Sequence, residues 1–180
     1  MPQMNSVQSI DINVLKSQVD AEIAARLLVE AEHALHIHRR GFQVGDLRLL
    51  VSMESASEVL AMPPLFRLPG APRGVNGLVN RHGRVVPVID MTDLFGVRHE
   101  GAENPWLLVC GRGDEAVGIT TSSLPERKKF VDGDRASIAE IGHPIAAYAK
   151  GAYREGRDIW IDLDTDAFFD SVFLVEPAPL

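Results

Sequence analysis

A chain of 180 residues can form one domain with a sizeable core, or two small barrels that share a core, but not two large domains. Apolar residues make up 46% of the chain and charged residues 24%, which is typical of a folded globular protein and excludes wholesale disorder. The formal net charge is -7 and no cluster of lysine and arginine stands out, so we expect neither nucleic acid nor an anionic membrane as a partner.

Two further features indicate where the protein works. Cys110 is the only cysteine, which excludes an intramolecular disulfide and fits a reducing compartment. The N-terminal segment lacks the basic and apolar regions of a signal peptide, and the chain has no run of about eighteen uninterrupted apolar residues. We therefore predict a cytoplasmic protein that does not insert directly into a membrane.

The first predicted element is a helix over residues 19–38. Its apolar residues Val19, Ile23 and Leu27 recur every four positions with charged residues between them, which predicts an amphipathic helix. We assign residues 1–39 to an N-terminal extension that contains this helix, and residues 40–180 to the main domain.

After Arg40 the apolar period falls to about two and turn residues become frequent, which predicts short strands. A hairpin is expected around Gly45 and Asp46. Further strands are expected at 58–60, 75–80, 84–90, 106–110, 116–121, 147–153 and 158–162. A short helix over 90–96 and a C-terminal helix over 164–174, each starting at an aspartate, complete the prediction. Many short strands favour a mainly β fold of small barrels or a sandwich.

The acidic and histidine residues form two groups of candidate metal ligands. Asp90 and Asp93 could combine with His82 and His99, but no known ligand spacing occurs and the two aspartates suit the ends of a short helix. A second group comprises Glu30, His33, His36 and His38. Sites built from this Glu-x-x-His pattern take it from several helices, so a solvated helix face explains the group better. We predict no metal and no cofactor.

Motifs for catalysis are also missing from the sequence. Cys110 ends the apolar run 107–110, where a buried core thiol is expected instead of a reactive thiolate. The tripeptide Arg112-Gly113-Asp114 fits a turn between two strands. No nucleophile elbow, phosphate loop or dinucleotide fingerprint occurs, so we predict that the protein is not an enzyme.

The segment 69–96 is the most informative part of the chain. It reads as a proline-containing loop, a strand, a tight turn, an apolar strand and a capped helical turn. In that order it resembles the signature of CheW-like chemotaxis coupling proteins. The segments 44–50, 151–153 and 159–160 are most similar to the PilI-like members, which are associated with pilus-based motility.

The resemblance implies a fold, a function and two partners. The implied fold is a pair of SH3-like five-stranded barrels with a hydrophobic seam between them. The implied function is that of a non-catalytic adaptor at membrane-associated receptor arrays. The partners would be the regulatory domain of a CheA-type histidine kinase and the cytoplasmic tip of a methyl-accepting chemoreceptor.

The same resemblance implies which residues bind partners. They are Glu58, Val59, Gly77, Asn80, Arg81, His82 and Leu107. For Gly77 an alternative is a glycine that a strand bulge requires.

One position departs from the family pattern. His82 stands where the family has an arginine, and that arginine pairs with the glutamate matched here by Glu58. If His82 and Glu58 pair in this chain, their coupling should weaken as the pH rises and the histidine loses its charge.

Three alternative functions remain open. The first is a specialised CheW-like protein that binds the kinase but has altered or lost receptor docking, because of the departure at His82. The second is a small β-barrel enzyme, and the third is a regulatory fragment of the kinase itself, since that regulatory domain has the same fold.

Overall fold

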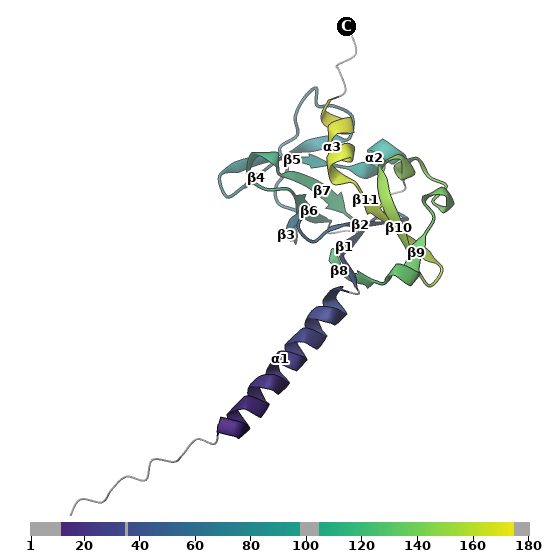
Figure 1. Ribbon diagram of the computed structural model, residues 1–180. Helices are drawn as coiled ribbons and strands as arrows, with labels where there is room; N and C mark the ends of the chain where they lie inside the picture. Colours follow the sequence, from purple (N-terminus) through teal and green to yellow (C-terminus); the bar gives the residue numbers. More distant parts are fainter. Residues whose placement is uncertain (1–11, 35, 98–104, 175–180) are drawn as a thin grey trace, which may run out of the picture. The chain divides into compact units, whose positions relative to one another are not determined.

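The computed structural model of the protein describes residues 12–34, 36–97 and 105–174, and the side chains of residues 16–31 in the first helix. The chain divides into two compact units, residues 1–37 and 38–180. The boundary between them lies two residues before the predicted boundary between 39 and 40. Figure 1 labels the helices and strands of both units.

The first unit contains helix α1 (Ile12–Ala34), which confirms the helix predicted near the N-terminus. Its apolar residues do not lie on one face, however. A spacing of four residues exceeds the 3.6 residues of a helical turn, so each step from Val19 to Ile23 to Leu27 moves about 40° around the axis. Leu28 and Val29 lie on yet other sides, and these five side chains are all exposed. The helix is therefore less amphipathic than the four-residue spacing suggested.

One of the two sheets in the second unit, sheet A, is built from the two ends of the domain. It has six strands in the order β8-β1-β2-β11-β10-β9. Their bounds are β8 Glu126–Phe130, β1 Ile37–Val44, β2 Leu47–Ser52, β11 Asp158–Leu163, β10 Ala149–Glu155 and β9 Arg135–Ala136. Strands β1 and β2 form the predicted hairpin at Gly45 and Asp46, and β11 runs parallel to β2.

The other sheet, sheet B, is formed by the middle of the domain, between β2 and β8. It has five strands in the order β3-β6-β7-β5-β4. Their bounds are β3 Ala56–Ala61, β6 Trp106–Cys110, β7 Val117–Thr121, β5 Arg84–Ile89 and β4 Val75–Arg81. The predicted mainly β fold of two five-stranded barrels with a helix near each end is confirmed as two curled sheets, although sheet A has a sixth strand, the two-residue β9.

The short helices follow the predicted capping residues. Helix α2 (Met91–Phe95) starts at the Asp90 side chain, which accepts a hydrogen bond from the Thr92 amide, and ends at Gly96 with a φ of 63°. Helix α3 (Thr165–Phe173) starts at the Asp164 side chain. The 3₁₀ helices are η1 Gly113–Glu115, η2 Asp132–Asp134, η3 Ile138–Glu140 and η4 Pro144–Tyr148.

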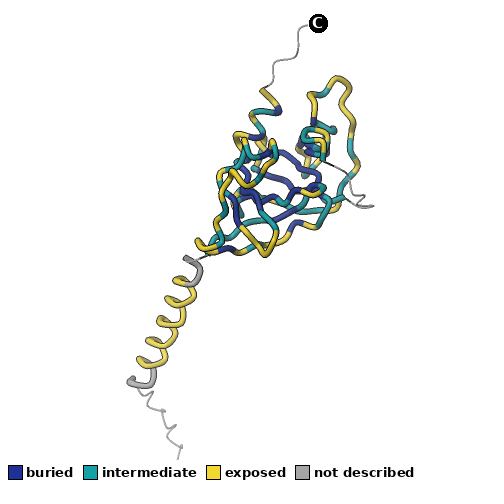
Figure 2. Tube along the Cα trace, turned by 90° about the vertical axis from the view of Figure 1, so that its right-hand side faces the viewer, coloured by how far each residue is buried: buried dark blue, intermediate teal, exposed yellow. Residues whose placement is uncertain are grey.

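The larger hydrophobic core lies between the two sheets. Leu49 and Ile161 of sheet A join Leu108 and Ile119 of sheet B in one buried cluster, and Phe168 of α3 covers it. Figure 2 shows the buried segments concentrated where the strands of the second unit lie together. A smaller cluster, which includes Val79, Val86 and Leu107, fills the interior of sheet B. The largest core is thus the seam that holds the two curled sheets together.

The opposite face of sheet A buries one charged side chain among apolar ones such as Leu50 and Trp160. Side chains alternate along a strand, so Asp162 of β11 points away from the seam, beside Leu50 of β2. Its side chain is only 3% exposed, and Arg39 lies 2.9 Å from its Oδ2 with both Nε and Nη2. The other oxygen, Oδ1, accepts no hydrogen bond from the described residues, and Lys150 Nζ lies 4.0 Å from it. A buried charge therefore depends on Arg39 for its compensation.

Strand β8 was not predicted, because four of its five residues are charged. In the structure Phe130 is buried against Tyr153, with the ring centroids 4.9 Å apart. Lys128 lies over the Trp160 ring, 4.5 Å from its centroid, and bonds to Glu155 at 2.9 Å. Lys128 and Phe130 are two positions apart, so their side chains lie on the same face of β8. This spacing was the signal that the sequence carried for this edge strand.

Candidate functional site

An ion pair joins the two outer strands of sheet B. Strands β3 and β4 stand at opposite ends of the sheet order, yet Glu58 of β3 and Arg81 of β4 are in contact. Arg81 Nη2 bonds to Glu58 Oε1, and Arg81 Nε donates to Glu58 Oε2 at 3.3 Å. The side chains are 26% and 34% exposed. This bidentate pair bridges the opening of the curled sheet, where no backbone pairing between β3 and β4 is described.

The predicted partner His82 lies within ion-pair distance of Glu58, but its neighbour Arg81 is the hydrogen-bonded partner. Arg81, not His82, makes the hydrogen bonds to Glu58, while His82 Nε2 lies 3.9 Å from Glu58 Oε1 and 3.3 Å from Arg81 Nη2. The reason is the turn: Arg81 pairs with Arg84, so only His82 and Gly83 connect the two strands. Both have positive φ angles, 51° and 77°, as a type I′ turn requires. The side chain of His82 is 78% exposed.

The turn leads to a prediction about residue 82. His82→Asn should keep or slightly raise the stability, because Asn-Gly is the preferred pair for this turn, whereas His82→Val should cost about 1–2 kcal/mol in the left-handed region. Urea unfolding measures both. The same cost for His82→Asn and His82→Val would contradict the role of the turn.

The ion pair between Glu58 and Arg81 leads to a prediction about pH. Arginine keeps its charge at every accessible pH, so this pair should not weaken between pH 6 and 8, roughly the range over which histidine switches.

The structure places the other predicted partner-binding residues differently. Asn80 is exposed and its Oδ1 accepts a hydrogen bond from the Gly83 amide at 3.1 Å, while Val59 is half-buried against the seam. Leu107 is fully buried in the core of sheet B, so it offers no surface to a partner in this conformation. Gly77 is also buried, at a bulge in β4.

The geometry at Gly77 matches the alternative of a bulge glycine. Its φ is 156°, and a Cβ atom there would meet the Phe66 carbonyl oxygen at 2.5 Å. Phe66 pairs with Leu78 through two backbone hydrogen bonds of 2.8 Å. The small size of Gly77 therefore lets the segment after β3 lie against β4.

An exposed apolar face, which the sequence reasoning missed, lies on the outer side of β4 and β5. We call it the outer face of sheet B; it comprises Phe66, Leu78, Val85 and Pro87. Phe66 is 67% and Val85 is 66% exposed. The signal in the sequence was the alternation in β5, where Val86 and Val88 point into the core and leave Val85 and Pro87 outside. Isolated exposed apolar residues are normal, but neighbours on one face indicate an interaction surface.

The residues weighed for catalysis and metal binding remain apart from these features. Cys110 is buried as predicted, and burial raises the pKa of its thiol to about 12, which makes a reactive thiolate unfavourable. Within residues 12–34, 36–97 and 105–174, no three or more His, Cys, Asp or Glu side chains gather as a metal site would require. His99 and the side chain of His33 lie outside the described residues. Among the described helices, none is long and apolar enough to span a bilayer.

Comparison with known proteins identifies the family. The model of the CheW-like domain matches residues 41–173, which run from the middle of β1 to the end of α3. The chain belongs to the CheW-like domain family. The match begins after α1, so the N-terminal helix lies outside the family's domain.

Individual CheW relatives agree with this assignment. The chain is 26% identical to chemotaxis protein CheW of Rhizobium meliloti (strain 1021) over 133 residues, which cover 72% of this chain and 85% of the relative. It is 44% identical to protein FrzA of Myxococcus xanthus over 50 residues, or 28% of this chain and 31% of FrzA. The crystal structure of the scaffolding protein TtCheW from Thermoanaerobacter tengcongensis has the same fold, with a TM-score of 0.63 at 16% identity, covering 71% of this chain and 84% of TtCheW.

Proposed function

We propose that this protein is a non-catalytic adaptor that couples the cytoplasmic tip of a methyl-accepting chemoreceptor to the regulatory domain of a CheA-type histidine kinase. The observation that carries the proposal is the match of residues 41–173 to the CheW-like domain. It would act in the cytoplasm at receptor arrays, through residues of the 40–180 domain. The resemblance of segments 44–50, 151–153 and 159–160 to PilI-like members, which are associated with pilus-based motility, supports a role in twitching motility.

The proposed receptor-binding surface is the cluster of Glu58, Asn80, Arg81 and His82. Arg81 and His82 lie within ion-pair distance of Glu58, and Asn80 bonds to the Gly83 amide of the adjoining turn; the ion pair fixes Glu58 and Arg81 in place. In the family pattern the cation that pairs with the glutamate comes from the position of His82. In this chain Arg81, one position earlier, supplies it, so the histidine at position 82 does not remove the ion pair with Glu58. This observation favours receptor docking over the alternative of an adaptor that binds only the kinase.

The proposed kinase-binding surface is the outer face of sheet B. Transient signalling contacts bury modest areas, and a few apolar side chains near their centre provide most of the binding energy. Phe66 and Val85 are the most exposed apolar side chains of this face. We therefore expect micromolar or weaker affinity, with a large loss from a single charged substitution.

Calorimetry with a kinase regulatory domain and a receptor-tip fragment from the same organism, each titrated separately, tests the proposal. Phe66→Asp should weaken kinase binding at least about tenfold and leave receptor binding unchanged, because Phe66 pairs with Leu78, whereas Val85 lies across from Asn80 of the receptor surface. Ile138→Asp is the matched control, since Ile138 is also an exposed apolar residue but lies in η3, away from sheet B.

A charge swap tests the receptor surface without removing the ion pair. The double variant Glu58→Arg with Arg81→Glu should keep its melting temperature and still bind the kinase domain, because the pair is preserved and the outer face is untouched. It should lose receptor binding by about tenfold or more, since the charges presented to the receptor are exchanged. If neither fragment binds the unmodified protein, the proposed function is wrong.

A further inference from the structure

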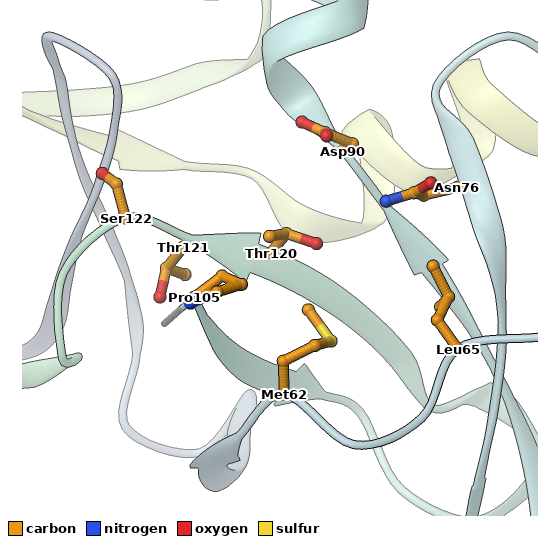
Figure 3. Close-up of a pocket in the computed structure, with 8 residues that line it drawn as sticks. All are labelled: Met62, Leu65, Asn76, Asp90, Pro105, Thr120, Thr121 and Ser122. Carbon is orange, nitrogen blue, oxygen red and sulfur yellow. The ribbon is translucent and has the colours of Figure 1, made fainter. Parts of the chain in front are cut away.

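A cavity of about 200 Å³ lies at one end of sheet B. Met62 and Leu65 from the segment after β3, Pro105 before β6, Asn76 of β4 and Thr120 of β7 line it (Figure 3). Thr120 pairs with Leu107, and Met62 and Leu65 pack against the core that contains Leu107. The cavity is thus the mouth of the curled sheet, a common place for ligands in β-barrels.

This cavity is separate from the proposed partner-binding surfaces. Asn76 lies five residues before Arg81 in β4, a separation of about 16 Å along the strand. Neither Glu58 nor the exposed side chains Phe66 and Val85 line it. A ligand bound here would therefore occupy a distinct site.

The hydroxyl of Thr120 distinguishes the cavity from an ordinary packing defect. Thr120 is 7% exposed, and its Oγ1 has no hydrogen-bond partner among the described residues. The next two hydroxyls along the chain are both engaged: Thr121 Oγ1 donates to the Ser123 carbonyl at 2.8 Å, and Ser122 Oγ donates to the Gln43 carbonyl at 3.0 Å. In Figure 3 the Thr120 oxygen points into the space toward Asn76. A buried hydroxyl is unfavourable unless a partner satisfies it, which points to a hydrogen-bonding ligand.

Charge and size restrict the ligand further. Asp90 is the one ionisable side chain among the described residues that line the cavity, and its carboxylate would repel an anion. Asp90 Oδ1 already accepts hydrogen bonds from the amide and the hydroxyl of Thr92, at 2.9 and 2.6 Å. An apolar cavity of about 150 Å³ is enough to hold benzene, so this one has room for a substituted ring.

We propose that this cavity is a binding site for a small neutral aromatic molecule that carries one hydroxyl group. Met62, Leu65 and Pro105 would contact the ring, and the ligand hydroxyl would bond to Thr120 Oγ1. The proposal is independent of the adaptor function, because it depends only on the cavity and on Thr120.

NMR titration of the isotope-labelled full chain with three probes tests the site. The probes are p-cresol, toluene and 4-hydroxybenzoate, which share a ring but differ in hydroxyl or charge. We expect shifts in the amides of Asn76 and Thr120, with p-cresol binding about five- to tenfold more tightly than toluene, the difference that one hydrogen bond makes. 4-Hydroxybenzoate should bind more weakly than p-cresol.

Matched variants identify the hydroxyl that is responsible. Thr120→Val should reduce the affinity for p-cresol to that for toluene. It should not lower the melting temperature, because it removes an unsatisfied polar group. Thr120→Ser should still bind p-cresol more tightly than toluene. Thr121→Val removes a hydroxyl that is already engaged and should also retain it. Absence of binding, equal affinities for p-cresol and toluene, binding of 4-hydroxybenzoate as tight as that of p-cresol, or a preference that survives Thr120→Val would each overturn the proposal.

Discussion

Arg39→Leu is expected to destabilise the domain by about 3 kcal/mol in urea unfolding, because it leaves the carboxylate of Asp162 buried without its main partner. The Asp162 side chain is 3% exposed, and Lys150 Nζ at 4.0 Å would be its nearest described cation. The value lies at the lower end of the range for broken buried pairs, since 23% of the Arg39 side chain is exposed to water.

Two comparison variants isolate the buried charge. Arg48→Leu removes an ion pair with Asp158 whose side chains are 34% and 46% exposed, and should cost less than about 1 kcal/mol. The double variant Arg39→Leu with Asp162→Leu removes both charges and should recover much of the lost stability. If Arg39→Leu lowers the free energy of unfolding no more than Arg48→Leu does, the buried pair of Arg39 and Asp162 is no more important for stability than an exposed one.

Gly77→Ala is expected to cost at least about 2 kcal/mol and to displace the segment that carries Phe66. The added Cβ would lie 2.5 Å from the Phe66 carbonyl oxygen, at a φ of 156° that side chains rarely adopt. Gly83→Ala is the matched control: its φ is 77°, but nothing lies within 4 Å of the added atom, so only the backbone strain of about 1 kcal/mol remains.

The displaced segment also connects Gly77 to partner binding. Since Phe66 belongs to the outer face of sheet B, Gly77→Ala should lower the melting temperature and weaken kinase binding together. A variant that loses binding but keeps its melting temperature would instead indicate that a partner contacts Gly77 directly. Thermal unfolding and calorimetry on the same samples distinguish these results.

Local structure could be predicted well because it depends on neighbouring residues. Asp90 and Gly96 marked the ends of α2, and Asp164 marked the start of α3, through capping that involves only adjacent amides. The hairpin at Gly45 and Asp46 was likewise evident from its turn residues. The order of these elements carried enough of the family pattern to indicate the fold, and the match of residues 41–173 confirmed it.

The contacts of the candidate site depended on strand register instead. Matching by position placed His82 opposite Glu58, but the two-residue turn leaves Arg81 as the last residue of β4 and makes it the partner. A shift of one residue moves a side chain to the other face of a strand, and periodicity alone does not determine where a strand ends. Leu107 was misjudged for a related reason: the sequence showed an apolar strand but not which side chains faced the interior of sheet B.

Sequence by itself determined the capped helices and the hairpins, since short-range chemistry specifies them, and it indicated the burial of Cys110 through the apolar run 107–110 and the CheW-like pattern through the segment 69–96. Only the tertiary structure decided which distant groups meet. Arg39 and Asp162 are separated by 123 positions, and the cavity beside Thr120 forms only when four separate strand ends and the segment after β3 come together. Such sites arise because the sheets curl and bring together residues that are far apart in the sequence and follow no regular spacing.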